Sequence, residues 1–182
     1  IWQDTQIPFG KAGNVTKPIT GNERTNSQSF EQLTSGVPYI VGWGAGNKAG
    51  TNDPNYGSIG ASISFTPGGN EDANGVVTGV LHQDLITPVV VGTSSIVVTF
   101  VTLDGNDPKK NGNWIGLWQG STLDFNGNYL QKWDVTSNNS QDSQGLNTTQ
   151  QIRSGSTYTL AYACGPNASD IVARCTFKTA SY

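Results

Sequence analysis

The sequence is poor in charged residues and contains no methionine, one histidine and two cysteines. Only 13% of its 182 residues are charged, and the formal net charge is −3. The 10 lysines and arginines are spread along the chain instead of forming a basic stripe, which argues against nucleic-acid binding. No apolar run approaches the roughly 18 residues of a membrane-spanning helix, so we expect no membrane span.

The shortage of catalytic residue types argues against an enzyme. The sole histidine, His82, has no metal-binding partner near it in the sequence, and the chain contains no Gly-x-Ser-x-Gly motif around a nucleophilic serine. Paired carboxylates for glycoside cleavage leave no mark in a single sequence, so a hydrolase stays the last of the alternatives. We expect a protein that is not an enzyme.

The start of the chain and its sequons favour export. The chain begins at Ile1 without methionine, and a cleaved secretory signal is the ordinary cause, although a chosen sequence boundary would look the same. Glycosylation sequons begin at Asn14, Asn138, Asn147 and Asn167, although a chain rich in Asn and Thr also produces sequons by chance. We expect a secreted, extracellular glycoprotein.

Cys164 and Cys175 are the only cysteines. An even number in an exported chain predicts one disulfide, and the positions indicate a structural role, not a catalytic one. A tight hairpin turning at residues 165–169 would place Cys164 opposite a residue near Asp170, so the disulfide requires a wider loop or a bulge.

Apolar residues alternate with polar ones wherever Gly, Pro, Asn or Asp do not interrupt the chain. This period of two predicts strands, and no stretch shows a sustained helical period. We expect strands at residues 95–103 and 113–119, and a further antiparallel pair at residues 158–164 and 171–177. The predicted fold class is all-β, an immunoglobulin/fibronectin-like or jelly-roll β-sandwich.

An internal repeat divides the chain. Residues 32–43 match residues 151–162, and residues 59–65 match residues 171–177. We therefore expect an incomplete N-terminal β unit at residues 1–82 and an immunoglobulin-like unit at residues 83–182. The first unit lacks counterparts of the strands at 95–119, so it requires substitute strands from residues 2–20, a second chain, or, as we favour, one continuous sandwich shared by both halves. The repeat aligns Trp43 with Tyr162, which predicts a core position for Trp43.

The second unit also carries a family resemblance. The strand Asn-Trp-Ile-Gly-Leu-Trp at residues 113–118 is followed by Tyr-x-Leu-x-Tyr-x-Cys at residues 158–164. This pattern resembles the strands of SKICH-type immunoglobulin-like domains over residues 86–182, about half of the chain. The resemblance implies an immunoglobulin-like sandwich and carries no function.

Oxygen-bearing side chains gather in loops that we expect at one end of the second unit. Asp and Asn oxygens spaced by one or two residues suit Ca²⁺, which takes six to eight hard oxygen ligands. Residues 124–128 offer similar donors at the other end of the unit. The alternative is that these residues bond their own backbone in turns, because the spacing is not that of an EF-hand. The candidate calcium ligands are Asp104, Asn106, Asp107 and Asp170.

Two tryptophans are candidates for stacking on a sugar. Ile115 and Leu117 occupy the opposite parity to Trp114 and Trp118, so an aliphatic pair facing the core would leave both indoles exposed among amide side chains. The alternative is that one or both indoles cap the core. The long loop at residues 46–57 is a second candidate binding region. The full carbohydrate-binding set is Trp114, Trp118, Asn111, Asn113, Asn167, Asn52, Asp53, Asn55 and Tyr56.

These observations support three function hypotheses. The leading one is a secreted carbohydrate-binding, lectin-like protein, which binds glycans or glycoproteins and has Ca²⁺ as its candidate cofactor. The alternative is a structural or adhesive surface protein that self-associates as a homo-oligomer, which the incomplete first unit favours. The third is a secreted toxin or effector that acts at cell surfaces.

Overall fold

The structure is a computed structural model, and it describes residues 1–19, 27–47, 54–69 and 79–181. These residues form strands and one short 3-10 helix, η1 (Ala168–Asp170), so the all-β prediction is confirmed. No helix in this part of the chain is long and apolar enough to cross a membrane. The strands are β1 (Tyr39–Gly44), β2 (Ile59–Phe65), β3 (Val80–Gln83), β4 (Leu85–Val91), β5 (Ser95–Val101), β6 (Trp114–Gln119), β7 (Gln131–Asp134), β8 (Gln141–Asn147), β9 (Thr157–Ala163) and β10 (Ile171–Lys178).

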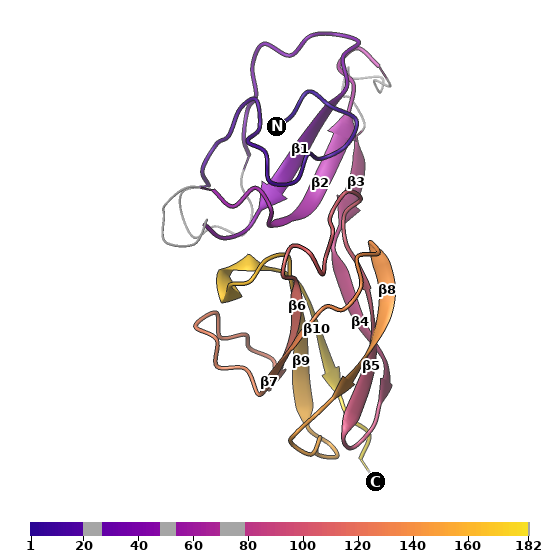
Figure 1. Ribbon diagram of the computed structural model, residues 1–182. Helices are drawn as coiled ribbons and strands as arrows, with labels where there is room; N and C mark the ends of the chain where they lie inside the picture. Colours follow the sequence, from indigo (N-terminus) through magenta and orange to yellow (C-terminus); the bar gives the residue numbers. More distant parts are fainter. Residues whose placement is uncertain (20–26, 48–53, 70–78, 182) are drawn as a thin grey trace.

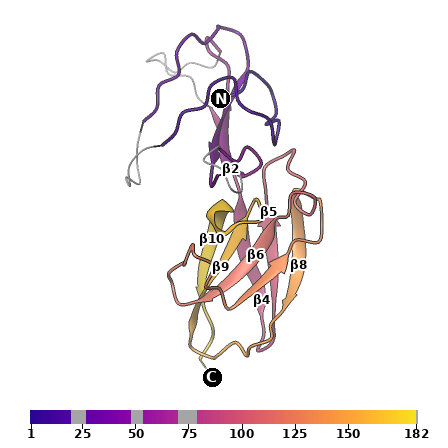
Figure 2. The ribbon, with the colours of Figure 1, turned by 60° about the vertical axis from the view of Figure 1, so that its left-hand side comes forward.

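The C-terminal half is a β-sandwich of two antiparallel sheets (Figures 1 and 2). One sheet has the strand order β4-β5-β8 and the other the order β10-β9-β6-β7. Alternating side chains of both sheets meet in one core, to which β5 contributes Val98 and Phe100, and β9 contributes Leu160 and Tyr162. The rings of Phe100 and Tyr162 stack across the core with centroids 5.4 Å apart. This packing is what the alternation in the sequence predicts.

The N-terminal half forms a separate three-stranded sheet with the order β1-β2-β3 (Figure 1). Residue 2 forms an isolated antiparallel bridge with Ile40 of β1, and the two backbone hydrogen bonds of this bridge both measure 2.9 Å. Trp2 then packs with Ile40, Ile59 and Leu103 in a small second core. Leu103 follows β5, so this core also joins the two halves of the chain.

A single residue, Asp84, separates β3 from β4. The two strands nevertheless belong to different sheets, and among the described residues no strand is shared between the first sheet and the sandwich. The N-terminal segment supplies one bridged residue beside β1, in place of a full strand.

The hairpins β1–β2 and β9–β10 have the same register over their central rows. Tyr39 pairs with Phe65 as Tyr158 pairs with Phe177, and both hairpins shift register at the same end, beyond the Trp43–Ala61 and Tyr162–Ala173 pairs. Both tyrosines stack on their paired phenylalanine, with centroids 6.1 and 5.9 Å apart.

The turn before each hairpin is also alike. Gly36 and Gly155 have φ angles of 76° and 67°, which glycine adopts without steric cost. In each hairpin the hydroxyl of the first tyrosine accepts a hydrogen bond from a backbone nitrogen five residues earlier. Thr34 donates to Tyr39, and Arg153 donates to Tyr158. The two hairpins therefore share local geometry, and their origin by duplication stays a prediction.

Candidate functional site

Trp114 and Trp118 lie on the outer face of their sheet but are covered. Each indole is at most 3% exposed. The prediction that both indoles face solvent is therefore wrong, and the alternative that they are buried is correct. Ile115 and Leu117 face the main core, as the alternation of side chains along this strand predicts. The chain after β6 turns back over the outer face and places Leu123 and Tyr129 against the indoles. Residues 120–130 therefore close the surface on which a sugar was expected to stack.

The amide side chains near these tryptophans make internal hydrogen bonds. Asn113 is fully buried and donates to the hydroxyl of Tyr162 at 2.8 Å. Asn111 donates to Oδ1 of Asn106 at 2.7 Å, and Asn106 donates to Oγ1 of Thr102 at the same distance. These contacts hold the loop between β5 and β6 and leave few amide groups facing solvent there.

The expected calcium ligands bond to other groups of the protein. Asp107 lies 3.5 Å from Lys110, and Oδ1 of Asp104 accepts a hydrogen bond from Ser140. Asn106 donates to Thr102 and, at 3.8 Å, to Sγ of Cys164, and Asp170 accepts from Asn167 and Asn55. In the described ranges, no group of three or more His, Cys, Asp or Glu residues is placed to hold a metal ion. The second cluster forms a turn in which Asp124 accepts from the backbone nitrogen of Asn126 at 2.8 Å. Calcium binding stays a prediction.

Asp170 connects the two halves of the chain. Its carboxylate is fully buried and accepts hydrogen bonds from the backbone and side chain of Asn167, at 2.9 and 3.1 Å, and from Asn55 at 3.3 Å. Tyr56, next to Asn55, contacts Thr16 through its hydroxyl at 3.2 Å. The other two candidates of this loop, Asn52 and Asp53, lie outside the described residues.

The predicted disulfide is wrong, because Cys164 and Cys175 are free thiols. Cys175 pairs with Leu160, which lies four residues before Cys164 along β9. A strand advances about 3.3 Å per residue, so this offset places the two cysteines much farther apart than the 7 Å that a disulfide tolerates between Cα atoms.

Asp84 is a buried carboxylate that the sequence did not single out. Its Oδ2 accepts from the thiol of Cys164 at 2.7 Å and from Thr102 at 3.2 Å, and its Oδ1 accepts from the backbone nitrogen of Leu103 at 3.0 Å. Burial raises the pKa of Asp84 to about 7, although these hydrogen bonds oppose the rise. Burial also raises the pKa of the Cys164 thiol. Asp84 lies between the short strands β3 (VLHQ) and β4 (LITPVVV), and no motif in the sequence marks it.

Trp43 is exposed, so the core position predicted for it is wrong. Its side chain is 57% exposed, whereas Tyr162, at the equivalent position of the other hairpin, is fully buried. The same face of the first sheet also exposes Leu81 at 66% and Ile63 at 37%. In the sandwich, sheet β4-β5-β8 covers the equivalent face, and the first sheet has no such layer among the described residues.

This uncovered face leads into a cleft between the two halves. The cleft holds about 320 Å³, and its apolar walls include Trp43 and Ala61 from the first sheet and Leu85 and Ala173 from the sandwich. Arg174 and Asp84 also line it.

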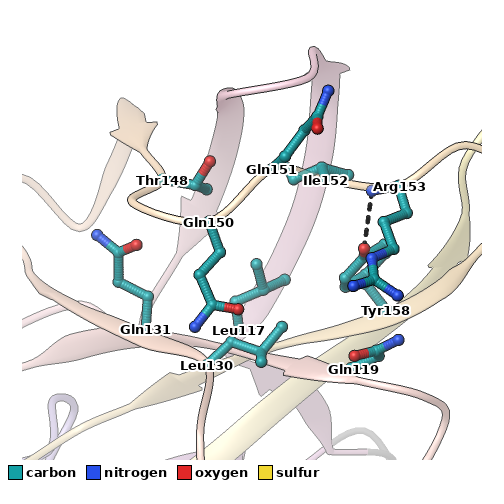
Figure 3. Close-up of a pocket in the computed structure, with 10 residues that line it drawn as sticks. All are labelled: Leu117, Gln119, Leu130, Gln131, Thr148, Gln150, Gln151, Ile152, Arg153 and Tyr158. Atoms are coloured by element: carbon teal, nitrogen blue, oxygen red, sulfur yellow. Dashed lines mark hydrogen bonds between the residues drawn. The ribbon is translucent and has the colours of Figure 1, made fainter.

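A second cavity, of about 190 Å³, lies where β6 and β7 meet the loop between β8 and β9 (Figure 3). Leu117, Leu130 and Ile152 supply apolar surface, and Gln150 extends toward the two leucines (Figure 3). The remaining lining residues are Gln119, Gln131, Thr148, Gln151, Arg153 and Tyr158. The sequence offered no motif for this cavity, because its lining comes from four separated segments.

Comparisons of the chain with protein families, with curated proteins and with solved structures gave no match.

Proposed function

We propose that this protein is a structural or adhesive protein that associates with a second copy of itself through the uncovered face of sheet β1-β2-β3. The observation that carries the proposal is the exposure of this face, whose equivalent is the buried core face of the sandwich. The proposal is for a protein that acts by binding and not by catalysis.

The uncovered face consists of cross-strand rows that are almost entirely apolar. Val41, Ile63 and Leu81 form one row, and the register places Trp43, Ala61 and Gln83 in the next. The half-buried Phe65 lies beyond the first row, and its cross-strand partner Tyr39 is buried. A contiguous apolar face of this kind is unusual on a monomer and is typical of an interaction surface.

The sandwich indicates what kind of layer fits this face. Around β9 and β10, the equivalent rows are Tyr158–Phe177, Leu160–Cys175 and Tyr162–Ala173, and the three-stranded sheet β4-β5-β8 packs on them. Sheet β1-β2-β3 also has three strands. Two copies placed face to face would form a second sandwich of the same kind.

The absence of charge on the face favours a second copy over a charged partner. None of the residues in its rows is Lys, Arg, Asp or Glu. In a two-fold interface each residue meets the same surface of the other copy, so a neutral face brings no like charges together. The adjoining cleft, lined by Trp43 and Leu85, gives apolar side chains of the second copy a place to insert.

Sedimentation equilibrium over a concentration series tests the proposal. We expect the wild-type chain to form dimers, and Leu81→Lys and Trp43→Lys to shift the population to monomers, because each buries a charge at the interface. Phe125→Lys is the matched control, since Phe125 is 58% exposed but lies in the loop after β6. A wild-type chain that stays monomeric at millimolar concentration, or dimers that resist both lysine variants, would contradict the proposal.

A further inference from the structure

The cavity at the far end of the sandwich is independent of the uncovered face. It is lined by residues from β6 and β9, from the start of β7 and from the loop between β8 and β9. In Figure 1 this loop lies at the end of the sandwich opposite to sheet β1-β2-β3. A ligand here would leave the proposed dimer face free.

Hydrogen bonds hold the walls of the cavity in place. Gln131 accepts from the backbone nitrogen of Thr149 at 2.8 Å and donates to the carbonyl of Asn147 at 3.0 Å. The backbone nitrogen of Ile152 donates to the carbonyl of Thr93 at 2.8 Å, which ties the loop to the turn between β4 and β5. The cavity is therefore formed before any ligand arrives, which lowers the entropic cost of binding.

Several polar groups of the lining have no partner in the described part of the chain. The side chains of Gln119, Gln150 and Arg153 make no hydrogen bond or ion pair there, and Oγ1 of Thr148 is buried without one. Oγ1 of Thr148 is buried and points away from Leu117 and Leu130 (Figure 3), so the amides of Gln119 and Gln150 are the groups that a ligand hydroxyl can reach. Amide groups both donate and accept, as sugar hydroxyls do.

The charge of the lining residues further restricts the class of ligand that fits the cavity. Among the residues that the structure describes, Arg153 is the only charged one that lines the cavity, and its guanidinium lies beside Tyr158 (Figure 3). A guanidinium binds a carboxylate through two parallel hydrogen bonds, and no acidic side chain of the lining competes for it. The apolar surface of Leu117, Leu130 and Ile152 suits the C–H face of a sugar ring.

We infer that this cavity binds one ring of an acidic saccharide, with the sugar carboxylate on Arg153 and the hydroxyls on Gln150 and Gln119. The volume of about 190 Å³ is below the 300–1,000 Å³ that is typical of sites for drug-sized ligands, so a single ring is the appropriate size.

Calorimetric titration of the full chain with D-glucuronate, D-glucose and acetate tests the inference. We expect glucuronate to bind at least about tenfold more tightly than glucose or acetate, since a charge-assisted hydrogen bond contributes about 1.5–3 kcal/mol. Equal affinity for glucuronate and glucose would overturn the role of the carboxylate. Equal affinity for glucuronate and acetate would overturn the saccharide assignment, and the absence of glucuronate binding would overturn the site.

Two pairs of variants locate the binding. Arg153→Gln is expected to weaken glucuronate binding about tenfold or more, because it removes the guanidinium and keeps the backbone bond to Tyr158. Gln150→Ala is expected to weaken it as well. Arg174→Gln and Gln141→Ala are the matched controls, since Arg174 lines the other cleft and Gln141, an exposed residue at the start of β8, does not line this cavity. Binding that is unaffected by Arg153→Gln, or equally weakened by Arg174→Gln, would overturn the inference.

Discussion

The thiol of Cys164 donates a 2.7 Å hydrogen bond to the carboxylate of Asp84, which lies 80 positions earlier in the chain. Asp84 is the residue between the first sheet and the sandwich, and its backbone nitrogen donates to the carbonyl of Gly60 in β2. Cys164 directly follows β9 at the centre of the sandwich. This bond therefore connects the junction of the two halves to the sandwich core.

Asp84 makes the stability of the fold depend on pH. Burial raises the pKa of Asp84 to about 7, whereas the carboxyl has its ordinary value of 3.8 in the unfolded chain. Between these values the folded protein holds a proton that the unfolded chain releases. The contribution of protonated Asp84 to the free energy of unfolding is therefore complete below about pH 4 and is lost as the pH rises through 7. The total loss is on the order of 4 kcal/mol.

The variant Asp84→Asn removes this titration, and urea unfolding between pH 4 and 9 measures the effect. We expect the difference in free energy of unfolding, wild type minus variant, to fall as the pH rises and to stay constant above about pH 8. Asp104→Asn, at an exposed position, is the control and should leave the wild-type pH dependence unchanged. A pH dependence of Asp84→Asn that equals that of the wild type would contradict the prediction.

The two thiols should differ in reactivity. Cys175 is half-buried, whereas Cys164 is buried and burial raises its pKa, so a thiol reagent should label Cys175 first and Cys164 only when the chain unfolds. Mass spectrometry of the native and the unfolded protein checks the order. A reducing agent should not change the thermal midpoint. A native mass that shows the loss of two hydrogen atoms would instead indicate a disulfide.

The hydroxyl of Tyr158 should contribute to stability through its bond to the backbone nitrogen of Arg153. The substitution Tyr158→Phe leaves that N–H without its acceptor, and we expect a loss of about 1–2 kcal/mol in urea unfolding. Tyr39→Phe removes the equivalent bond to Thr34 and should act in the same direction. Tyr56→Phe is the control, because its hydroxyl contacts Thr16 in an exposed environment, and it should change stability by less than about 0.5 kcal/mol. A null effect of Tyr158→Phe would show that the bond does not contribute.

Tyr129 should shield the buried indoles from solvent. Its ring lies 5.8 Å from Trp114 and 5.9 Å from Trp118, between centroids. We expect Tyr129→Ala to shift tryptophan fluorescence to the red and to destabilise the fold by about 1–2 kcal/mol, because it removes the aromatic contacts and opens the cover. Phe125→Ala in the same loop is the control, since Phe125 is 58% exposed. Equal spectra for the two variants would argue against this role.

Much of the strand structure was predictable from the sequence, and the exceptions have physical reasons. The strand expected at residues 113–119 is β6, and the one expected at residues 95–103 contains β5. β8, with the sequence QDSQGLN, carries no apolar alternation and buries one side chain, Leu146. Its backbone pairing with β5 makes it a strand, and pairing between segments about 45 residues apart leaves no local pattern.

The candidate site was less predictable than the strands. The parity of Trp114 and Trp118 correctly placed them away from the main core, but residues 120–130 decide that they are buried. Trp43 shows the reverse error, since its alignment with Tyr162 was structurally sound and its exposure was not foreseen. In both cases burial depends on whether another segment packs on the face: residues 120–130 cover the two indoles, and no described segment covers Trp43.

Local sequence determined which segments are strands and which side chains share a face, because side-chain direction alternates with a period of two in any strand. Only the tertiary structure decided which of those faces are covered: it buried Tyr162 under β4-β5-β8 and left Trp43 in solvent. The reason is that burial depends on contacts between distant segments, whereas alternation depends on neighbouring residues alone.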